Sequence, residues 1–546
     1  MPPRFIFVIG GVISGLGKGI TTASIGKLLQ YQGYSVTAIK IDPYLNQDAG
    51  TMRPTEHGEV WVTEDGGEID QDLGNYERFL GIELHKNHNI TSGRVYWSIL
   101  TKERRGDFLG KTIQPIPQVT NEIKKMITDI AKEDNADFVL IEIGGQVGDY
   151  ENVLFLEAAR QMKTDFPVMY ILVGYLPIPK HLGEMKTKPI QHAINALGQH
   201  NILPDLVVCR AEKIVDDVRR TKIAQSCGIK RSCVISNPDV DNIYKIPLIL
   251  DDQNVCQNIL ESFGLKYNKH CEGLKNWRAF IQNINKNTKV KVGIIGKYFD
   301  IGDFNLVDSY ISVIEAVKHA AWNNNCFAEI IWIDSKKYED DPKSIKELDN
   351  MDCIIVPGGF GKSGIEGKIS TAKYCRENNI PYLGLCLGLQ ISVIEFARNV
   401  CNLKNANSEE FNPETAHPVV AIINEQKKIL KEKGYGATMR LGGWPAILKK
   451  GTKIYHLYSK QEQISERHRH RYEINPKYIE TLEKYGFVFS GQNPEANIME
   501  FGENPNCDYF VGTQAHPEFK SRPMKPAPLF DGLIKAALNK TQKKLS

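Results

Sequence analysis

Short apolar runs alternate with longer amphipathic stretches in two separate parts of the chain. In the first part the runs occupy residues 5–9, 35–41, 137–143, 168–173 and 206–209, and in the second 291–295, 329–333, 353–356 and 382–385. Runs of this length between helical stretches are typical of buried parallel strands with helices on both faces of the sheet. The pattern therefore predicts an α/β fold with two doubly wound parallel-sheet domains, whose ligands bind at the carboxyl ends of the strands.

A polar stretch rich in asparagine and lysine separates the two series of apolar runs. It covers residues 266–290 and contains one helix-like segment around Trp277. Composition alone predicts a first domain at 1–270, a linker at 271–290, a second domain at 291–538 and a polar basic tail at 539–546. Residues 404–435 are expected to form an excursion loop, and no internal repeat is visible.

Bulk composition is typical of a cytoplasmic protein without a nucleic-acid or membrane partner. The 546 residues carry a net charge of +3, which gives no sign of a nucleic-acid or membrane partner. The chain starts without a signal peptide pattern, and its longest apolar run, 166–179, is too short to span a bilayer. The eleven cysteines include no C-x-x-C pair, so we expect reduced thiols in a cytoplasmic protein.

The first apolar run leads into a glycine-rich turn. The turn reads Gly10-Gly-Val-Ile-Ser-Gly-Leu-Gly-Lys-Gly19, and a helix is expected to open at Thr21-Thr22. Glycines let backbone N–H groups face a phosphate, and Lys18 would reach the outer phosphates. The spacing departs from the strict P-loop pattern, so we interpret the turn as a variant phosphate loop, the alternative being an ordinary βα turn.

Carboxylates follow in the stretch from Met52 to Asp72. Mg²⁺ prefers one or two carboxylates plus water, and the candidate ligands are Asp72 and Glu142. Glu142 ends a strongly apolar strand, where a buried carboxylate is costly unless it is paired or metal-bound. For Asp72 alone, its position in an acidic loop favours a solvated acid. Lys40, at another strand end, would face an anionic ligand or lie at the solvated surface.

Basic residues gather in two further segments of the first half. Lys186 and Lys188 are two positions apart, and the second segment reads Arg219-Arg220-Thr-Lys222. Either segment is suited to hold a second triphosphate, and either is also consistent with a solvated run of charges.

The second half contains the pattern of a cysteine nucleophile. Gly384-Leu-Cys386-Leu-Gly388 lies between a predicted strand and the predicted helix 389–398, which is the layout of a nucleophile elbow. His516 would serve as base and Glu518 would orient it, a set suited to acyl transfer through a thioester. Backbone N–H groups of 357–361 and of Leu387 are candidates for the oxyanion hole. Arg471 is suited to clamp a carboxylate.

Together these motifs resemble the CTP synthase family along nearly the whole chain. The first-half motifs that carry the resemblance lie at 10–19, 40–46, 50–52, 57–60, 72–79 and 186–191. The second-half motifs, at 384–390 and 516–518, resemble class I glutamine amidotransferases in general. The resemblance implies an N-terminal synthetase (amidoligase) half and a C-terminal glutaminase half, with ammonia passing internally from the second to the first.

The resemblance also implies a role for individual residues. Glutamine would be hydrolysed by Cys386, His516 and Glu518 and bound by Gly359, Leu387, Gly388, Leu389, Gln390, Glu410 and Arg471. ATP would bind at Gly15, Leu16, Gly17, Lys18, Gly19, Ile20, Asp72 and Val240, with Mg²⁺ on Asp72 and Glu142. UTP, or CTP as an inhibitor, would contact Ser14, Lys40, Asp149, Tyr150, Glu151, Lys186, Thr187, Lys188, Pro189, Ile190, Gln191 and Lys222.

The implied activity is the ATP-dependent amination of UTP at position 4 through a 4-phospho-UTP intermediate. The family further implies homotetramers, filaments and activation by GTP. Arginine commonly stands in the family where this chain has Ser363, and the loss of a guanidinium leaves GTP activation open, with Lys362 as a substitute. Two other hypotheses remain: a glutamine-dependent ligase for another acceptor, and a non-enzymatic ATP-binding assembly protein.

Overall fold

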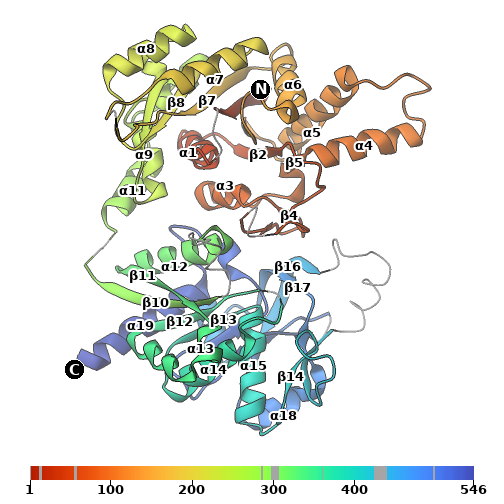
Figure 1. Ribbon diagram of the computed structural model, residues 1–546, viewed down its shortest axis with the longest axis vertical. Helices are drawn as coiled ribbons and strands as arrows, with labels where there is room; N and C mark the ends of the chain where they lie inside the picture. Colours follow the sequence, from red (N-terminus) through yellow and green to blue (C-terminus); the bar gives the residue numbers. More distant parts are fainter. Residues whose placement is uncertain are drawn as a thin grey trace. The chain divides into compact units, whose positions relative to one another are not determined.

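A computed structural model describes residues 2–11, 15–53, 58–181, 183–284, 287–296, 307–359, 361–422, 439–495 and 498–545 (Figure 1). The chain divides into two compact units. The first unit contains Met1–Ala49 and Asp70–Asn283, and the second contains Gly50–Ile69 and Ile284–Ser546. Residues 50–69, which come early in the sequence, therefore belong to the second unit. The domain boundaries expected from composition stay a prediction.

The first unit is built on a seven-stranded sheet in which every pairing is parallel. Its strand order is β5-β2-β6-β1-β7-β8-β9, so β1 pairs with β6 on one side and β7 on the other. The strands are β1 (Arg4–Gly10), β2 (Val36–Asp42), β5 (Asn89–Thr91), β6 (Phe138–Ile143), β7 (Val168–Tyr175), β8 (Leu206–Ala211) and β9 (Val234–Pro238). All seven residues of β1 are buried, because the strand lies inside the sheet and both of its faces are covered. This explains its unbroken apolar run.

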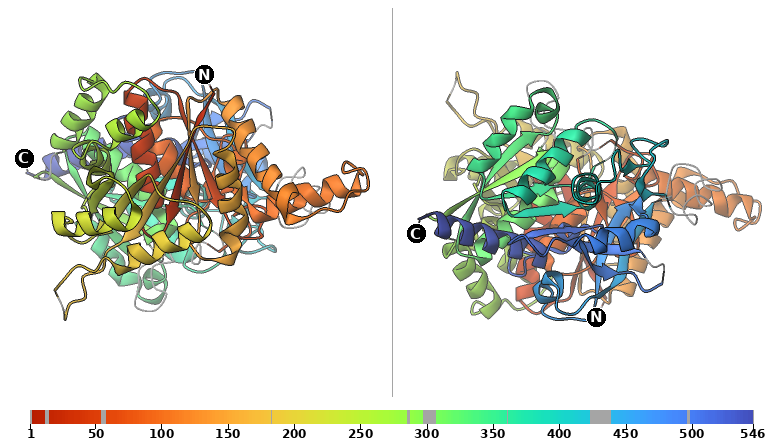
Figure 2. Two further views of the ribbon diagram at one scale, coloured as in Figure 1. Left: turned by 90° about the horizontal axis from the view of Figure 1, so that it is seen from above. Right: turned by 90° about the horizontal axis from the view of Figure 1, so that it is seen from below.

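Helices cover both faces of this sheet (Figures 1 and 2). Phe5, Phe7 and Ile9 alternate along β1 and pack into a core that includes residues of α5 to α8. On the other face, α1 packs against α3 and α9. The helices are α1 (Lys18–Tyr31), α3 (Asp72–Leu80), α4 (Ser92–Arg104), α5 (Thr120–Glu133), α6 (Val153–Met162), α7 (Lys188–Gln199), α8 (Asp217–Cys227), α9 (Ile246–Asp251), α10 (Val255–Ser262) and α11 (Glu272–Gln282).

The second unit contains a nine-stranded mixed sheet. Its order is β11-β10-β12-β13-β21-β20-β19-β16-β17; the first five strands are parallel and the remaining pairings are antiparallel. The strands are β10 (Lys289–Gly296), β11 (Phe327–Asp334), β12 (Cys353–Val356), β13 (Tyr382–Leu385), β16 (Arg440–Leu448), β17 (Gln463–His470), β19 (Val488–Gln492), β20 (Met499–Glu503) and β21 (Phe510–Thr513). The predicted α/β class is confirmed, and the second sheet adds an antiparallel part.

Apolar clusters lie on both faces of the mixed sheet. One includes buried residues of α14 and α15, and the other joins α12 to α19. The helices of this unit are α12 (Ile311–Asn323), α13 (Lys337–Asp340), α14 (Ile365–Glu377), α15 (Leu387–Asn399), α17 (Lys453–Leu457), α18 (Ile479–Lys484) and α19 (Pro528–Leu545). Two small sheets complete it: β14 (Asn407–Ser408), β15 (Pro418–Ala421) and β18 (Glu473–Ile474), and the hairpin of β3 (Trp61–Val62) with β4 (Glu68–Ile69).

Three local expectations differ from the structure. Helix α1 begins at Lys18 rather than at Thr21, because Gly17 adopts a left-handed conformation and turns the chain into the helix directly. The expected excursion loop contains the short strands β14 and β15, while residues 423–438 lie outside the described residues. The expected polar tail continues α19 to Leu545, where Thr541 donates to Asp352 at 3.1 Å.

A search of the described residues for membrane-spanning helices gives a negative result, since none combines the length and the hydropathy that a bilayer crossing requires.

Candidate functional site

The predicted phosphate loop joins β1 to α1. Gly15 and Gly17 have φ angles of 71° and 72°, a conformation that favours glycine. Residues 12–14 lie outside the described residues, so the predicted nucleotide contact of Ser14 has no structural counterpart here. The opening amides of α1 follow Gly17 directly, which is the backbone arrangement that binds phosphate.

Lys18 turns back from the first turn of α1 toward the end of the sheet. Its Nζ donates to the Gly145 carbonyl oxygen at 3.1 Å, and a Cβ on Gly10 would lie 2.8 Å from that Nζ. Glycine at position 10 therefore makes room for the lysine. Burial lowers the pKa of Lys18, against the opposing effect of Glu142.

Lys40, at the end of β2, is surrounded by four carboxylates. Its Nζ lies 3.1 Å from Glu142, 3.8 Å from Asp70 and 3.9 Å from Asp42, and it also contacts Asp72. Burial acts to lower the pKa of Lys40, but Asp70 and Asp72 outweigh it and the pKa is raised well above its usual value. Lys40 is 5% exposed, so it is not a solvated surface lysine, and its contact with an anionic ligand stays a prediction.

The two predicted Mg²⁺ ligands belong to this cluster. Asp72 opens α3 and Glu142 lies on β6, and both carboxylates face Gly19, where a Cβ would clash with Asp72 and lie 3.3 Å from Glu142. Burial raises the pKa of Glu142, against the lowering effect of Lys40. Oxygen donors with an excess of negative charge fit the preference of Mg²⁺. Among the described residues, no group of three or more His, Cys, Asp or Glu side chains is arranged as a metal site.

The residues predicted to bind UTP or CTP come from several elements. Asp149 and Glu151 lie just after β6, where the Asp149 carboxylate accepts from the Gln146 amide at 2.9 Å, and Tyr150 is 94% exposed. The 186–191 segment includes the start of α7, and Lys222 lies on α8. Val240, predicted to contact ATP, follows β9.

Sequence reasoning missed four residues of the first unit. Asp42 and Asp70 complete the carboxylate group around Lys40, and Tyr76 donates to Glu142. Arg210 ends β8, where its guanidinium donates to the carbonyl oxygens of residues 237 and 238 at 3.0 Å and approaches Gly17. Asp42 directly follows the predicted strand 35–41, and this position at a strand end was the available signal.

Cys386 lies between β13 and α15 in a strained backbone conformation. Its φ of 51° and ψ of −101° are unusual for a residue with a side chain, as expected of a nucleophile elbow. The Gln514 side chain donates to its Sγ at 3.8 Å, and the Sγ lies 3.9 Å from the carbonyl oxygen of Arg469. The sulfur thus lies between two polar groups at the start of α15.

His516 and Glu518 form a hydrogen-bonded pair next to this elbow. The His516 Nδ1 lies 2.7 Å from the Glu518 Oε1. Burial acts to lower the pKa of His516, but Glu518 and Cys386 outweigh it and raise the pKa to about 10. The imidazole is therefore protonated at neutral pH and places a positive charge beside the Cys386 side chain.

These three side chains share one cavity of about 480 Å³. Its lining also includes three predicted glutamine-binding residues, Gly359, Glu410 and Arg471. Gly358 leaves room for the catalytic groups, because a Cβ there would lie 2.8 Å from the His516 ring and 3.6 Å from the Cys386 Cβ. A substrate amide that enters this cavity therefore meets sulfur, imidazole and a guanidinium together.

The predicted residues 387–390 lie in the first turn of α15. Leu387 opens the helix, where amide groups have no intrahelical acceptor, as its predicted oxyanion role requires. Gln390 is buried, and its Nε2 donates to the Tyr472 carbonyl oxygen at 3.0 Å. Phe360, in the other predicted oxyanion segment, lies outside the described residues.

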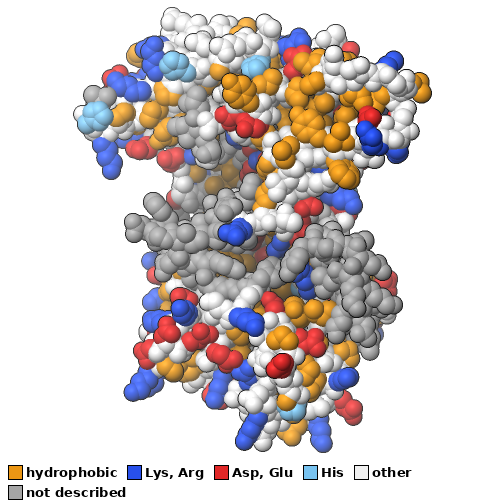
Figure 3. Space-filling view, turned by 45° about the vertical axis from the view of Figure 1, so that its right-hand side comes forward, with side chains coloured by type: hydrophobic (Ala, Val, Ile, Leu, Met, Phe, Trp, Pro, Cys, Tyr) orange, Lys and Arg blue, Asp and Glu red, His pale blue; other side chains and the backbone are white. Residues whose placement is uncertain are grey.

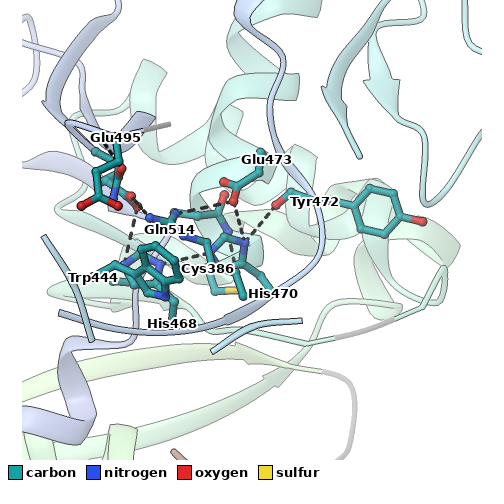
Figure 4. Close-up of polar contacts among 12 residues, drawn as sticks. Cys386, Trp444, His468, His470, Tyr472, Glu473, Glu495 and Gln514 are labelled. Atoms are coloured by element: carbon teal, nitrogen blue, oxygen red, sulfur yellow. Dashed lines mark hydrogen bonds and ion pairs between the residues drawn. The ribbon is translucent and has the colours of Figure 1, made fainter. Parts of the chain in front are cut away.

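A buried polar network lies beside the nucleophile (Figure 4). Gln390 also contacts Gln514 at 3.3 Å, and the His470 Nδ1 lies 3.2 Å from the Tyr472 carbonyl oxygen. A carbonyl only accepts, so His470 Nδ1 carries the proton and its Nε2 accepts from His468 Nδ1 at 3.0 Å. Burial lowers the pKa of both histidines, which keeps the network neutral beside the reacting groups.

The comparisons with known proteins cover both halves of the chain. The sequence model of a family described as CTP synthase N-terminus matches residues 4–265, and that of class-I glutamine amidotransferase matches residues 305–536. A CTP synthase of Methanocaldococcus jannaschii is 50% identical over 98% of both chains. Another, from Caldanaerobacter subterraneus, is 50% identical over 98% of both chains.

Among solved structures, the glutaminase domain of a Trypanosoma brucei CTPS with bound acivicin is 38% identical to this chain. It matches over 46% of this chain and 94% of its own length, with a TM-score of 0.42. Identity of about half over nearly the full length of the curated relatives is decisive. The chain belongs to the CTP synthase family, the glutamine-dependent carbon–nitrogen ligases, and its second half is a class I glutamine amidotransferase domain.

Proposed function

We propose that this protein converts UTP to CTP, using ATP and the ammonia released from L-glutamine. The observation that carries the proposal is the shared cavity of Cys386, His516 and Glu518, in a chain whose other unit has a glycine-rich turn leading into α1. Family membership supports the choice of nucleotide substrate. The assignment of individual residues rests on the contacts described above.

In the glutaminase half, the Cys386 thiolate attacks the side-chain amide carbon of glutamine. The His516 imidazolium gives its proton to the departing nitrogen, which leaves as ammonia, and a thioester remains. Water then attacks the thioester with His516 as base, which releases glutamate and restores the thiolate. Glu518 holds the imidazole through its 2.7 Å hydrogen bond, and Arg471, which lines the same cavity, would bind the glutamine carboxylate.

In the synthetase half, the γ-phosphoryl group of ATP passes to the 4-oxygen of UTP and makes that oxygen a good leaving group. Ammonia adds at carbon 4, and phosphate departs. Lys18 would bind the phosphates, and Asp72 and Glu142 would hold Mg²⁺; the burial of Lys18 at the end of the sheet and the approach of both carboxylates to Gly19 support this. The metal supplies charge neutralisation during phosphoryl transfer. Unprotonated ammonia has to reach this half by an internal, water-poor route.

The proposal includes regulation by nucleotides and assembly into tetramers. CTP would inhibit by occupying the UTP residues, and the tetramers would stack into filaments. Exposed apolar side chains on α4 and the segment after it support an assembly surface in the first unit (Figure 3): Tyr96, Trp97, Leu100, Leu109 and Ile116. We infer a cytoplasmic location from the eleven free cysteine thiols.

The test is a coupled assay with purified protein. With UTP, ATP, Mg²⁺ and glutamine we expect CTP, ADP, phosphate and glutamate in equal amounts. Release of ADP and glutamate with another acceptor and none with UTP would favour the ligase for a different substrate. Glutaminase activity that is the same in wild type and in Cys386→Ala would favour the assembly protein. Failure to form CTP even with ammonium salts would overturn the proposal.

A further inference from the structure

Residues 58–69 form a hairpin ribbon that packs into the second unit. Its strands β3 and β4 pair through Trp61 with Ile69 and Val62 with Glu68. Along the sequence the ribbon lies between β2 and α3, which both belong to the first unit. It starts just after the cavity residues Gly50 and Met52, and its own first residues, Glu59 and Val60, line the same cavity.

Charged contacts fix the tip of the ribbon to β17 and to the segment after His516. Glu64 lies 3.1 Å from the Arg467 Nε and 3.0 Å from the Lys520 Nζ. Arg467 also donates to the Val62 carbonyl oxygen at 3.1 Å and is fully buried. Burial alone would raise the pKa of Glu64, but Lys520 and Arg467 outweigh it and lower the pKa, so the carboxylate is ionised. A buried arginine bonded to both backbone and carboxylate is a rigid anchor.

Stacked rings connect the ribbon to the catalytic histidine. Trp61 meets Phe519 edge to face with ring centroids 4.9 Å apart, and Phe519 stacks on His516 at 5.4 Å. The Arg467 guanidinium lies over the Trp61 ring, 5.5 Å from its centroid. Trp61 is fully buried. The orientation of the His516 ring thus depends on a phenylalanine that the ribbon tryptophan holds in place.

Strand β17 supports both catalytic side chains through its backbone. The His516 amide donates to the Arg467 carbonyl oxygen at 2.7 Å, and the Arg469 carbonyl oxygen lies 3.9 Å from the Cys386 sulfur. The side chain of Arg469 is held in turn by Glu68 of the ribbon, at 2.8 Å. The ribbon therefore binds the side chains of Arg467 and Arg469. The backbone carbonyl groups of these two arginines contact His516 and Cys386.

The second unit is shaped to receive the ribbon. The Gly443 amide donates a hydrogen bond to the Glu64 carbonyl oxygen at 2.8 Å. A Cβ on Gly443 would clash with the Glu64 carboxylate. Gly442 has a φ of 86°, and a Cβ there would lie 2.7 Å from the Glu64 carbonyl oxygen. Two adjacent glycines in β16 thus allow an approach that any side chain would block.

We propose that the ribbon is a positioning element of the glutaminase site, with Trp61 orienting His516 through Phe519 and Glu68 fixing Arg469 beside Cys386. Phe519 and Arg469 line the cavity beside His516 and Cys386, and Trp61 and Glu68 act through these two residues. This inference rests on the proposed function, because its measured quantity is glutamine hydrolysis.

The first test replaces the tryptophan in the full-length protein. Trp61→Leu removes the edge contact with Phe519, and we expect the glutaminase kcat to fall about tenfold, with a smaller change in KM, because the imidazole is misplaced rather than lost. Trp61→Phe keeps an aromatic edge and should restore most of the kcat. CTP synthesis from ammonium salts should stay at the wild-type level in both variants, since it does not use His516.

The second test leaves the packing volume unchanged. Glu68→Gln removes the charge that holds Arg469, and we expect a severalfold fall in glutaminase kcat. Glu480→Gln is the matched control, because Glu480 is exposed on α18. A kcat within twofold of wild type in Glu68→Gln and in folded Trp61→Leu would overturn the inference, and Glu68→Gln alone decides if Trp61→Leu does not fold. An inactive wild type would instead contradict the proposed function.

Discussion

The two units use the same architectural rule but prepare their chemistry in different ways. In both, candidate residues lie at the carboxyl ends of parallel strands, Lys40 and Glu142 in the first unit and Cys386 in the second. The first unit gathers four carboxylates, and Asp42, Asp70, Asp72 and Glu142 all surround the ammonium group of Lys40. The second unit brings complementary groups into contact, with a nucleophile, an imidazole and a carboxylate in one cavity.

This difference follows from what each reaction requires of the protein. Phosphoryl transfer depends mainly on positioning and on neutralising the charges of the substrate, and the charged cluster around Lys40 is the part of the first unit that we propose for this role. Burial raises the pKa of Asp70 to about 7, against the lowering effect of Lys40, a sign of how crowded the carboxylates are. Acyl transfer from an amide needs a nucleophile and an acid in fixed geometry, and this geometry is already present.

The largest expected effect separates the two sites completely. Cys386→Ala removes the nucleophile, and glutamine-dependent CTP synthesis should fall by about 10⁴-fold or more. Synthesis from ammonium salts should stay at the wild-type rate, because Cys386 has no part in phosphoryl transfer. Parallel assays with the two nitrogen sources measure this. Loss of both activities in a folded variant would mean that the sites are not chemically independent.

The converse substitution tests the first unit. Lys18→Ala removes the cation of the phosphate loop, and ATP-dependent turnover should fall by about 10³-fold with either nitrogen source. Basal glutamine hydrolysis should be preserved. Rates of ADP and glutamate release, measured separately, provide the comparison, and unchanged ADP release would argue against a phosphate-binding role for this loop.

A third change sharpens the account of the glutaminase site through its pH dependence. His516 acts as an imidazolium, which is lost as the pH rises through its raised pKa of about 10. Glu518→Gln removes a negative charge that raises this pKa, so the alkaline limb of the kcat/KM profile should move to lower pH. The rate at neutral pH should fall about 100-fold. An alkaline limb at the wild-type position would contradict the proposed role of Glu518.

The smallest expected effect concerns regulation. Lys362, next to Ser363, lines a separate cavity of about 560 Å³ in the second unit. A serine cannot replace a planar guanidinium, so we expect a weak response to GTP, and Ser363→Arg should increase the activation severalfold. Glutaminase rates with and without GTP test this. Strong activation of the wild type would indicate that Lys362 is sufficient.

Much of this arrangement could be predicted from local sequence. The buried strands β1 and β6 appear as apolar runs because both of their faces are covered, and the elbow at Cys386 has glycines two positions away on each side. His516 and Glu518 are two residues apart, so their contact could also be predicted.

The groups that the sequence did not predict are those held by distant partners. Glu64 and Arg467 are 403 positions apart, and nothing in the acidic stretch around Glu64 indicates which sheet it packs on. Gln514 was missed because its neighbours give no sign that it faces a sulfur. The antiparallel part of the second sheet was missed for a related reason, since its strands are partly exposed and have mixed polarity.

The course of the chain through the ribbon limits how this protein can be divided. A boundary placed after residue 283 looks like the natural place to cut, yet it assigns residues 50–69 to the wrong fragment. In a chimera built from two relatives at that boundary, the ribbon of one parent would face the β16 glycines and β17 arginines of the other. Such a hybrid keeps native contacts at its amidase only if residues 50–69 are exchanged as part of the C-terminal cassette.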